Sequence, residues 1–259
     1  MQVYVDGDIL LYRCAALGEI GMPVNHGFTI KTSSYHDSIE RLEECIKSIK
    51  QFCNSNDVVF CLSHKENFRK KINPNYKANR ENKVYPECLP RLRLYLEQHY
   101  DTLSADNLEA DDILGIYATT PECENCIIVT DDKDLKTVPC RYLVKLSDAT
   151  KYDSHFDDCV ESISKAEALK NLYMQAATGD KTDGYAGIPG IGPKFAEKMF
   201  KDCISEEDYW NKLKKGYANK GFNEDDAILN LRMARILQAT DFEEGKISLY
   251  RPPLTEEAA

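Results

Sequence analysis

Short apolar runs that end in aspartates are the feature that most constrains what this chain can fold into. The run 3–5 leads into the acidic segment Asp6–Asp8, and the run 126–130 leads into Asp131–Asp134. With segments of helical periodicity between them, such runs predict buried strands of a mostly parallel α/β sheet that carries helices on both faces. Ligands bind such sheets outside the carboxyl ends of the strands, so we expect the acids to meet at one edge.

The rest of the N-terminal part continues this alternation of strands and helices. Residues 20–33 form a polar excursion that a hairpin would explain. Further strands are predicted at 57–62, 102–104 and 142–146, and helices at 9–17, 34–52 and 86–99.

From residue 165 onwards the pattern is all helical. Helices are predicted at 166–178, at 206–215, at 224–240, and up to Phe200 after a Gly/Pro-rich turn. We therefore expect two parts, an α/β domain at 1–164 and a helical subdomain at 165–259. No membrane span is predicted, because no run of about 18 apolar residues occurs.

The N-terminus and the cysteines indicate a cytoplasmic protein. Met1–Asp6 has no basic region and carries an acid at once, unlike a signal peptide. Of the ten cysteines only Cys123 and Cys126 form a CxxC pair, and no second pair completes a zinc site. We expect reduced, buried thiols, and a location in the cytoplasm, which for a viral protein is the host cytoplasm.

The net charge of −10 argues at face value against a nucleic-acid partner. Acids that converge on bound cations, however, stop repelling phosphate. The segment Lys65–Lys83 also holds seven basic residues against two acidic ones. If 75–80 is helical, Lys77 and Arg80 point the same way, although a solvated basic face is the alternative interpretation. The charge of the chain therefore neither supports nor excludes a nucleic-acid partner.

Three carboxylates, on Glu109, Asp111 and Asp112, fall within four positions just before an apolar run. Alone they suit a helix start, whose N-terminus favours each acid by roughly 0.3–1 kcal/mol. Acidic clusters elsewhere, at predicted strand ends and tight turns, favour a functional site instead. The candidate metal ligands are Asp6, Asp8, Glu109, Asp111, Asp112, Asp132, Asp134, Asp180 and Asp183.

This many carboxylates cannot stay ionised in one cleft without cations. Ligands that are all oxygen select hard ions such as Mg²⁺ or Mn²⁺. Because Mg²⁺ takes only one or two carboxylates directly, the acids predict two ions, some bound through water. Two ions roughly 4 Å apart suit an in-line displacement at phosphorus, which predicts phosphodiester hydrolysis.

Residues 187–194 form a turn dense in glycine and proline ahead of a predicted helix. Glycines let a backbone approach a ligand closely, and a helix N-terminus offers free amides to a phosphate. A nucleotide-binding P-loop needs Ser or Thr after the lysine, where this chain has Phe195. We expect a hairpin that holds the DNA backbone without reading bases, with a purely structural turn as the alternative.

Six motifs follow one another in a fixed order along the chain. They are Val5–Gly7, Tyr76-Lys77-x-x-Arg80, Glu109–Asp112, Thr130–Asp134, Gly179-Asp180-x-x-Asp183 and Gly187–Gly192. This order resembles the 5′-nuclease (flap endonuclease) family. The segments Asp6–Asp8, Asn73–Arg80 and Arg232–Leu237 make the chain most similar to the bacteriophage 5′→3′ exonucleases of that family, over about residues 3 to 253.

The resemblance implies a PIN-like nuclease domain followed by a helix–three-turn–helix over 166–200. It also implies two Mg²⁺ ions, for which Mn²⁺ can substitute. The first ion is implied to lie among Asp6, Glu109, Asp111 and Asp112, and the second among Asp132, Asp134, Asp180 and Asp183.

The resemblance further implies how DNA is held. Lys77 and Arg80 would lie on a gateway helix and stabilise the charge of the scissile phosphate. The residues implied to contact DNA are Tyr76, Gly190, Ile191, Gly192 and Lys194, with K⁺ at the hairpin. One departure stands out, since relatives place an Asp after the second strand where this chain has Ser63 and His64. Asp8 would compensate, with the 109–112 cluster carrying more of the first ion.

The expected activity is hydrolysis at or near 5′ ends of duplex or flapped DNA, releasing 5′-phosphorylated products. The expected context is phage DNA replication, primer removal or recombination, which includes RNA–DNA hybrids as substrates, and the expected state is a monomer. A PIN-type ribonuclease and a non-catalytic DNA-binding subunit remain the alternatives. The first would be shorter and lack the hairpin, and the second would have lost its acids.

Overall fold

The computed structural model describes residues 1–24, 28–80, 83–123, 125–151 and 153–253. Six strands form its central sheet. They are β1 (Val3–Asp6), β4 (Val58–Cys61), β5 (Thr102–Leu103), β6 (Ile127–Val129), β7 (Cys140–Val144) and β8 (Glu161–Ile163). Their order is β5-β4-β1-β6-β7-β8, and all neighbours are parallel except β7 and β8. This confirms the predicted α/β class.

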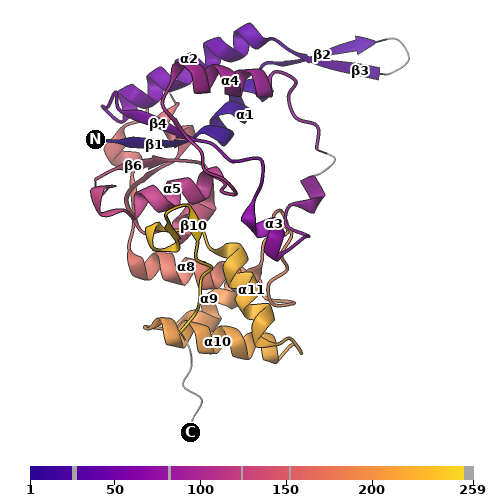
Figure 1. Cartoon of the computed structure of the whole chain (residues 1–259), viewed down its shortest axis with the longest axis vertical. Coiled ribbons are helices and arrows are strands. Elements are labelled where there is room, and N and C mark those ends of the chain that lie inside the picture. Colours follow the sequence, from indigo (N-terminus) through magenta and orange to yellow (C-terminus); the bar gives the residue numbers. More distant parts are fainter. Residues whose placement is uncertain (25–27, 81–82, 124, 152, 254–259) are drawn as a thin grey trace.

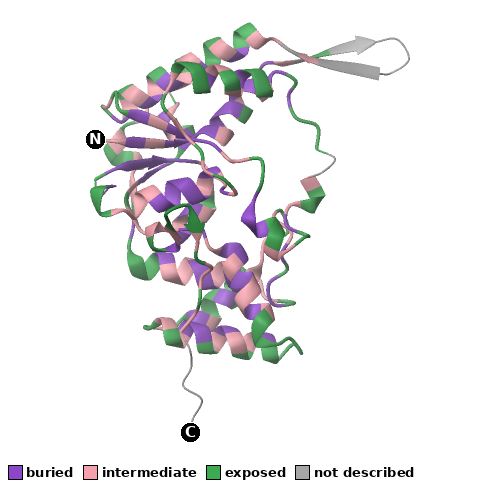
Figure 2. Ribbon diagram, in the orientation of Figure 1, coloured by how far each residue is buried: buried purple, intermediate pink, exposed green. Residues whose placement is uncertain are grey.

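Helices cover both faces of the sheet (Figure 1). On one face lie α1 (Gly7–Leu17), α2 (Tyr35–Phe52) and α4 (Leu89–His99), and on the other lie α5 (Ala110–Ala118) and α8 (Lys165–Thr178). Because side chains alternate along a strand, Ile127 and Val129 of β6 pack with the first group and Ile128 with the second. Figure 2 shows the sheet and the inward helix faces as buried.

The remaining segments of the N-terminal part are short. A hairpin of β2 (Glu19–Val24) and β3 (Phe28–Ser33) confirms the expectation for residues 20–33, of which 25–27 lie outside the described residues. The short helices are α3 (Phe68–Ile72), α6 (Leu146–Ala149), α7 (Phe156–Cys159), η1 (Ala78–Arg80), η2 (Pro121–Cys123) and η3 (Lys133–Thr137).

Helices α8, α9 (Pro193–Phe200), α10 (Glu206–Ala218) and α11 (Glu224–Ala234) enclose a separate hydrophobic cluster. Its largest fully buried side chains are Tyr173, Trp210 and Tyr217. The predicted helix 224–240 is wrong over its last six positions, since α11 (11 residues) stops at Ala234. The chain then runs through η4 (Ala239–Asp241), β9 (Phe242–Glu243) and β10 (Lys246–Ile247).

This C-terminal segment packs back on the sheet domain. Ile236 and Leu237 join the hydrophobic cluster around α5. A Cβ at Gly115 of α5 would lie 2.4 Å from the Leu237 carbonyl oxygen, so only glycine admits the contact. The division at residue 164 stays a prediction, but the last part of the chain contacts both sides of it.

The cysteines of the chain are partly oxidised in the structure. Cys123 and Cys126 form a disulfide, so the prediction of reduced thiols is wrong for this pair, whose two cysteines lie only three positions apart. The other eight cysteines are free. Among the described residues, no helix is long and apolar enough to cross a bilayer.

Candidate active site

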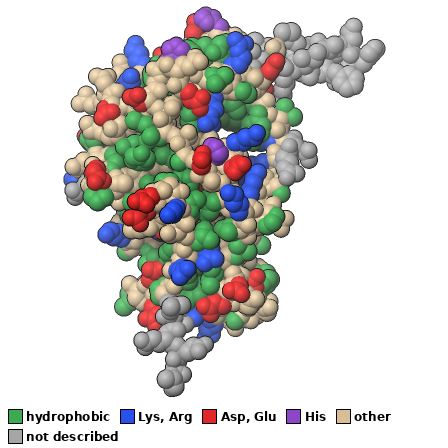
Figure 3. Space-filling model, in the orientation of Figure 1, with side chains coloured by type: hydrophobic (Ala, Val, Ile, Leu, Met, Phe, Trp, Pro, Cys, Tyr) green, Lys and Arg blue, Asp and Glu red, His purple; other side chains and the backbone are tan. Residues whose placement is uncertain are grey.

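The predicted acids meet beyond the carboxyl ends of β1 and β6, in one cavity of about 310 Å³. Eight of the nine candidate ligands line it, and Lys77 and Arg80 stand in its wall. Figure 3 shows Lys and Arg side chains gathered on the right of the molecule, in the region of α3 in Figure 1. The lining acids are Asp6, Asp8, Glu109, Asp111, Asp132, Asp134, Asp180 and Asp183.

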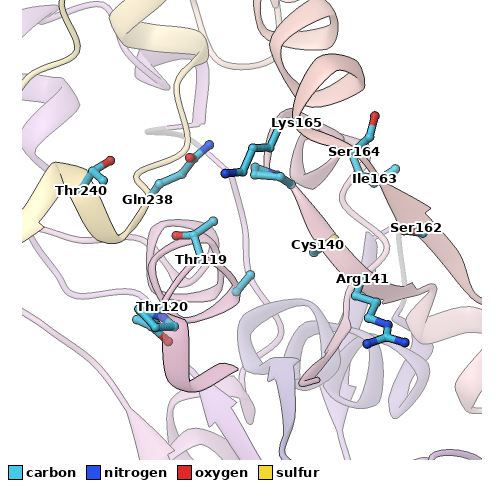
Figure 4. Close-up of a pocket in the computed structure, with 13 residues that line it drawn as sticks. Thr119, Thr120, Cys140, Arg141, Ser162, Ile163, Ser164, Lys165, Gln238 and Thr240 are labelled. Atoms are coloured by element: carbon cyan, nitrogen blue, oxygen red, sulfur yellow. The ribbon is translucent and has the colours of Figure 1, made fainter. Parts of the chain in front are cut away.

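A larger cavity, of about 670 Å³, lies at the opposite end of the sheet, between the end of α5 and the start of β7. Thr119, Lys165 and Gln238 approach it from three different elements (Figure 4). None of the described residues that line it is acidic. A site for hard cations therefore belongs to the smaller cavity, despite its size.

Asp6 and Asp132 are held in register by one threonine. Asp6 caps α1 by accepting from the Ile9 amide at 3.0 Å, and accepts from the Thr130 hydroxyl at 2.8 Å. The Asp132 amide donates to the same hydroxyl at 3.0 Å. Since Thr130 follows β6, this oxygen joins the ends of two adjacent strands and fixes the spacing of their acids.

Ser63 stands where relatives were expected to have an Asp, and it is part of the scaffold. Its amide donates to Asp8 Oδ2 at 3.1 Å, and its hydroxyl accepts from the Ala110 amide at 2.9 Å. The serine thus orients Asp8 toward the cavity and supports the start of α5. Compensation by Asp8 stays a prediction.

Glu109 is surrounded by cations. Lys77 Nζ lies 2.5 Å from Oε1, while the Tyr76 hydroxyl at 2.6 Å and Arg69 Nη1 at 3.2 Å donate to Oε2. Burial alone would raise the pKa of Glu109, but Lys77 and Arg69 outweigh it and lower the pKa to about 2. The carboxylate therefore stays ionised throughout the physiological range.

Asp111 and Asp6 have the opposite environment. Burial, together with the charges of Asp6 and Asp132, raises the pKa of Asp111 well above its usual value. Burial also raises the pKa of Asp6 to about 7, with Asp8 and Asp132 adding to the rise. Acids in this state are stabilised by a cation that takes the place of the proton.

The other side of the cavity is formed by η3 and by the turn after α8. Burial and the charge of Asp132 raise the pKa of Asp134 to about 6. Asp180 closes its turn by accepting from the Thr182 amide at 2.7 Å, and Lys133 Nζ lies 3.7 Å from its other oxygen. These carboxylates come from segments about 50 residues apart in the chain.

Lys77 and Arg80 both face the cavity, but not from the predicted helix. Lys77 has φ 54° and precedes a 3₁₀ helix that covers 78–80 among the described residues here, so the expectation that Lys77 lies on a helix is wrong. The Lys77 amide donates to the Asp183 carbonyl at 3.0 Å, and Arg80 Nη2 donates to Asp183 Oδ1 at 2.7 Å. Backbone pairing with the Asp183 turn, which requires Gly184 at φ 80°, replaces the helix.

Asp112 is the one predicted ligand that does not reach the cavity. It is fully buried, and both of its oxygens accept from Arg69 at 2.7 Å. It also accepts from the Leu237 amide at 3.1 Å. With both oxygens engaged in this ion pair, Asp112 serves the scaffold, and we withdraw it as a metal ligand.

Tyr76 also departs from expectation. It was predicted to contact DNA, but only 3% of it is exposed, and it packs with the helical cluster. Its hydroxyl donates to Glu109 at 2.6 Å and lies 3.3 Å from Asp183 Oδ2. Tyr76 therefore lies on the interior side of the acids, where its hydroxyl contacts Glu109 and Asp183.

The hairpin residues lie outside the cavity, ahead of α9. Gly190 has φ 82°, and a Cβ at Gly190 or Gly192 would meet no atom within 4 Å. Gly192 begins α9 without a side-chain cap, and Phe195 on the first turn is 64% exposed. The turn therefore presents open backbone, which fits a contact with an extended ligand.

The chemistry of the cavity fits divalent cations. Among the described residues that line it, the protonatable groups other than Lys77, Arg80 and Lys133 are carboxylates, with no His or Cys. Within the part of the chain that the structure describes, no three Asp, Glu, His or Cys side chains stand close enough to hold one ion. In the structure Lys77 forms an ion pair with Glu109, and Arg80 forms one with Asp183. These two side chains would have to move away from the carboxylates before a metal ion could bind there.

A family model for the N-terminal resolvase-like domain of 5′-3′ exonucleases matches residues 2–158. The chain belongs to the 5′-3′ exonuclease family. The exonuclease of Escherichia phage T7 is 25% identical, over 96% of this chain and 92% of the relative. The exodeoxyribonuclease of Enterobacteria phage T3 is 28% identical, over 84% and 71%.

The fold agrees with this membership. A bacteriophage T5 flap endonuclease, solved with DNA and metal ions, covers 90% of this chain and is covered to 88%, with a TM-score of 0.65 at 17% identity. The resemblance inferred from the six motifs is therefore confirmed at the level of family, fold and enzyme class, that of nuclease hydrolases.

Two residues that contact the candidate site, Arg69 and Thr130, were not predicted from the sequence. Arg69 lies in the basic run, but its guanidinium is buried and serves Asp112 and Glu109. Thr130 was placed at the end of a strand and in the Thr130–Asp134 motif, without a role of its own. A threonine directly before an acidic turn is the signal that could have marked it, since Ser and Thr often bond to nearby backbone amides.

Proposed function

We propose that this chain is a divalent-metal-dependent 5′→3′ exodeoxyribonuclease and flap endonuclease. One observation carries the proposal, namely that eight carboxylates from four separate segments line a single cavity with Lys77 and Arg80 in its wall. Family membership supports the reaction class, and the acids support the metal requirement.

The acids divide into two groups that would each hold one Mg²⁺, or Mn²⁺ in its place. Asp6, Asp8, Glu109 and Asp111 form one group, and Asp132, Asp134, Asp180 and Asp183 the other. When bound, such ions activate a water and stabilise the leaving oxygen of a phosphodiester.

Lys77 and Arg80 supply the positive charge that the protein itself can offer to a phosphate. Both are ion-paired with Glu109 or Asp183, so their cationic groups are already held at the cavity wall. Once cations neutralise those acids, the two side chains are free to bind the scissile phosphate and the negative charge that develops on it.

DNA would be held by the hairpin as well as by the cavity. The open backbone of Gly190 and Gly192, with Lys194 on the first turn of α9, offers amides and a charge to duplex phosphates. Ile191 lies between the two glycines, but its amide donates to the Ile188 carbonyl at 3.0 Å. We propose K⁺ at this turn. The substrates would include flapped duplexes and RNA–DNA hybrids, and the enzyme would act as a monomer in the cytoplasm during phage DNA replication or recombination.

Digestion of three labelled substrates tests the proposal. A 5′-labelled duplex, a 5′-flapped duplex and a single-stranded RNA are incubated with Mg²⁺ or with EDTA. We expect Mg²⁺-dependent cleavage near the 5′ ends of the two DNAs. Preferred cleavage of the RNA would favour a PIN-type ribonuclease, and DNA binding without any cleavage would favour a non-catalytic binding subunit.

A further inference from the structure

The packing of α1 on α2 brings two free cysteines together away from the carboxylate cavity. A Cβ at Gly18, just after α1, would lie 2.6 Å from Ser38 Oγ on α2, and the Ser34 amide donates to the Gly18 carbonyl at 3.3 Å. The end of α1 therefore lies against the start of α2. Cys14 is four positions before Gly18, which is one turn of α1. Cys45 is seven positions after Ser38 and shares its face of α2, so the two cysteines meet where the helices touch.

The two thiols differ in their access to solvent. Cys14 is 1% exposed and belongs to the hydrophobic cluster of the sheet, whereas Cys45 is only partly buried at the edge of that cluster. Both are free, and the Cys14 thiol donates a hydrogen bond to the Cys45 sulfur. A reagent from solvent can therefore reach Cys45 first, with the second sulfur already in contact behind it.

The charges around the pair favour a thiolate at Cys45. The hydrogen bond from Cys14 is the largest cause, and with the charges of Arg13 and Arg41 it lowers the pKa of Cys45 to about 7, although burial and Glu44 oppose the shift. The same hydrogen bond and burial raise the pKa of Cys14. Because the thiolate is the nucleophile, Cys45 is the reactive sulfur of the pair and Cys14 stays protonated.

We propose that Cys45 is an oxidation site for hydroperoxides and that Cys14 resolves the oxidised product, so that a disulfide forms between α1 and α2. Neither cysteine lines the carboxylate cavity, so the modification is separate from the proposed nuclease reaction. Thiolates that are partly exposed and lie next to a second cysteine are the ones that undergo this chemistry in proteins.

The reaction has two steps. In the first, the Cys45 thiolate attacks one oxygen of the peroxide, the O–O bond breaks, and the other oxygen leaves as hydroxide and takes up a proton. Cys45 is thereby oxidised to a sulfenic acid, and the peroxide is reduced. In the second, the Cys14 sulfur attacks the Cys45 sulfur, the S–O bond breaks, and the oxygen leaves as water with the proton of Cys14. In total two thiols lose two electrons, and one hydrogen peroxide becomes two waters.

Peptide mapping of the full chain after treatment with one equivalent of hydrogen peroxide at pH 7 tests the proposal. Trypsin leaves Cys14 in peptide 14–31 and Cys45 in peptide 42–47. We expect these two peptides to be joined after peroxide and to be separate again after dithiothreitol. The existing bridge between Cys123 and Cys126 lies in other peptides, so it does not obscure the result.

Variants separate the roles of the two sulfurs. Cys45→Ser should give no joined peptide, and Cys14→Ser should retain a sulfenic acid at Cys45 that dimedone labels. This label should appear at Cys45 at least about tenfold faster than at Cys53, a buried cysteine of raised pKa at the end of α2. The control Cys159→Ser, at a half-exposed cysteine of α7, should give the joined peptides as the wild type does.

Two results would overturn the proposal, and both are obtained on the wild type, so neither depends on a variant that folds. Oxidation of other free cysteines while Cys45 stays reduced would show that Cys45 is not the reactive thiol. A sulfenic acid that persists at Cys45, with peptides 14–31 and 42–47 separate, would show that Cys14 does not resolve it.

Discussion

The two adjacent aspartates of α5 have opposite roles, although the sequence presents them as one cluster. Asp111 lines the cavity and receives no hydrogen bond from the described residues, whereas Asp112 is fully bonded to Arg69 and to the Leu237 amide. Adjacent helical positions point about 100° apart, so one acid can face the sheet edge while the other faces the interior.

Asp112→Asn should therefore damage folding before catalysis. It removes the closer of the two acids that pair with the buried Arg69 guanidinium and leaves only Glu109, a loss of up to about 3–5 kcal/mol for a buried pair. We expect thermal unfolding of the variant to begin well below that of the wild type, both with and without Mg²⁺. An unchanged unfolding temperature together with lost cleavage would return Asp112 to the metal site.

Lys77→Ala should lower turnover more than affinity. Its ammonium is held at the cavity wall by Glu109 and Asp183, where negative charge would develop on the phosphate. Removing one such group costs about 10²–10³-fold in kcat. Single-turnover cleavage and DNA binding, measured side by side, check this, and a loss confined to binding would make Lys77 an ordinary phosphate contact.

At the scale of the elements, the strand ends were predictable and the connections between them were not. Asp6 and Asp132 follow apolar runs whose parallel pairing could be foreseen, so their meeting at one edge was expected. Arg69 and Asp112 are 43 positions apart in the chain, and no local sequence pattern predicts their ion pair. The segment after Ala234 was read as helix because its apolar residues fit that period, but they pack on α5 in extended form.

The hairpin before α9 can be tested through its charge. Lys194→Ala should weaken duplex binding and reduce the slope of log K against log salt by about 1, because one phosphate contact is removed. Lys220→Ala, an exposed lysine beyond the end of α10, is the matched control and should leave the slope unchanged. A wild-type slope in the Lys194 variant would remove the hairpin from the DNA interface.

For the whole molecule, the acid cavity makes stability depend on pH and on metal. The folded state raises the pKa of Asp6 to about 7 and of Asp134 to about 6, from an ordinary value near 4, so it binds protons more tightly than the unfolded chain. These groups therefore favour folding at low pH and lose that contribution as pH rises from about 4 to about 7. The lowered pKa of Glu109, about 2, acts only below this window.

Mg²⁺ should accordingly stabilise the protein more at pH 7.5 than at pH 5.5, since it replaces protons that are absent at the higher pH. Thermal unfolding in EDTA and in Mg²⁺, at equal ionic strength and at both pH values, measures this difference. A rise in Tm of the same size at both pH values would show that the ions bind away from these acids.

The most direct test of the account is cleavage by Asp111→Asn, which removes one charge from the cavity and no hydrogen bond. Its rate on a 5′-labelled flapped duplex in saturating Mg²⁺ is compared with that of the wild type, alongside DNA binding measured in EDTA. We expect a fall in cleavage of at least about 10²-fold with binding nearly unchanged. A wild-type cleavage rate would show that this carboxylate cavity is not where the phosphodiester is hydrolysed.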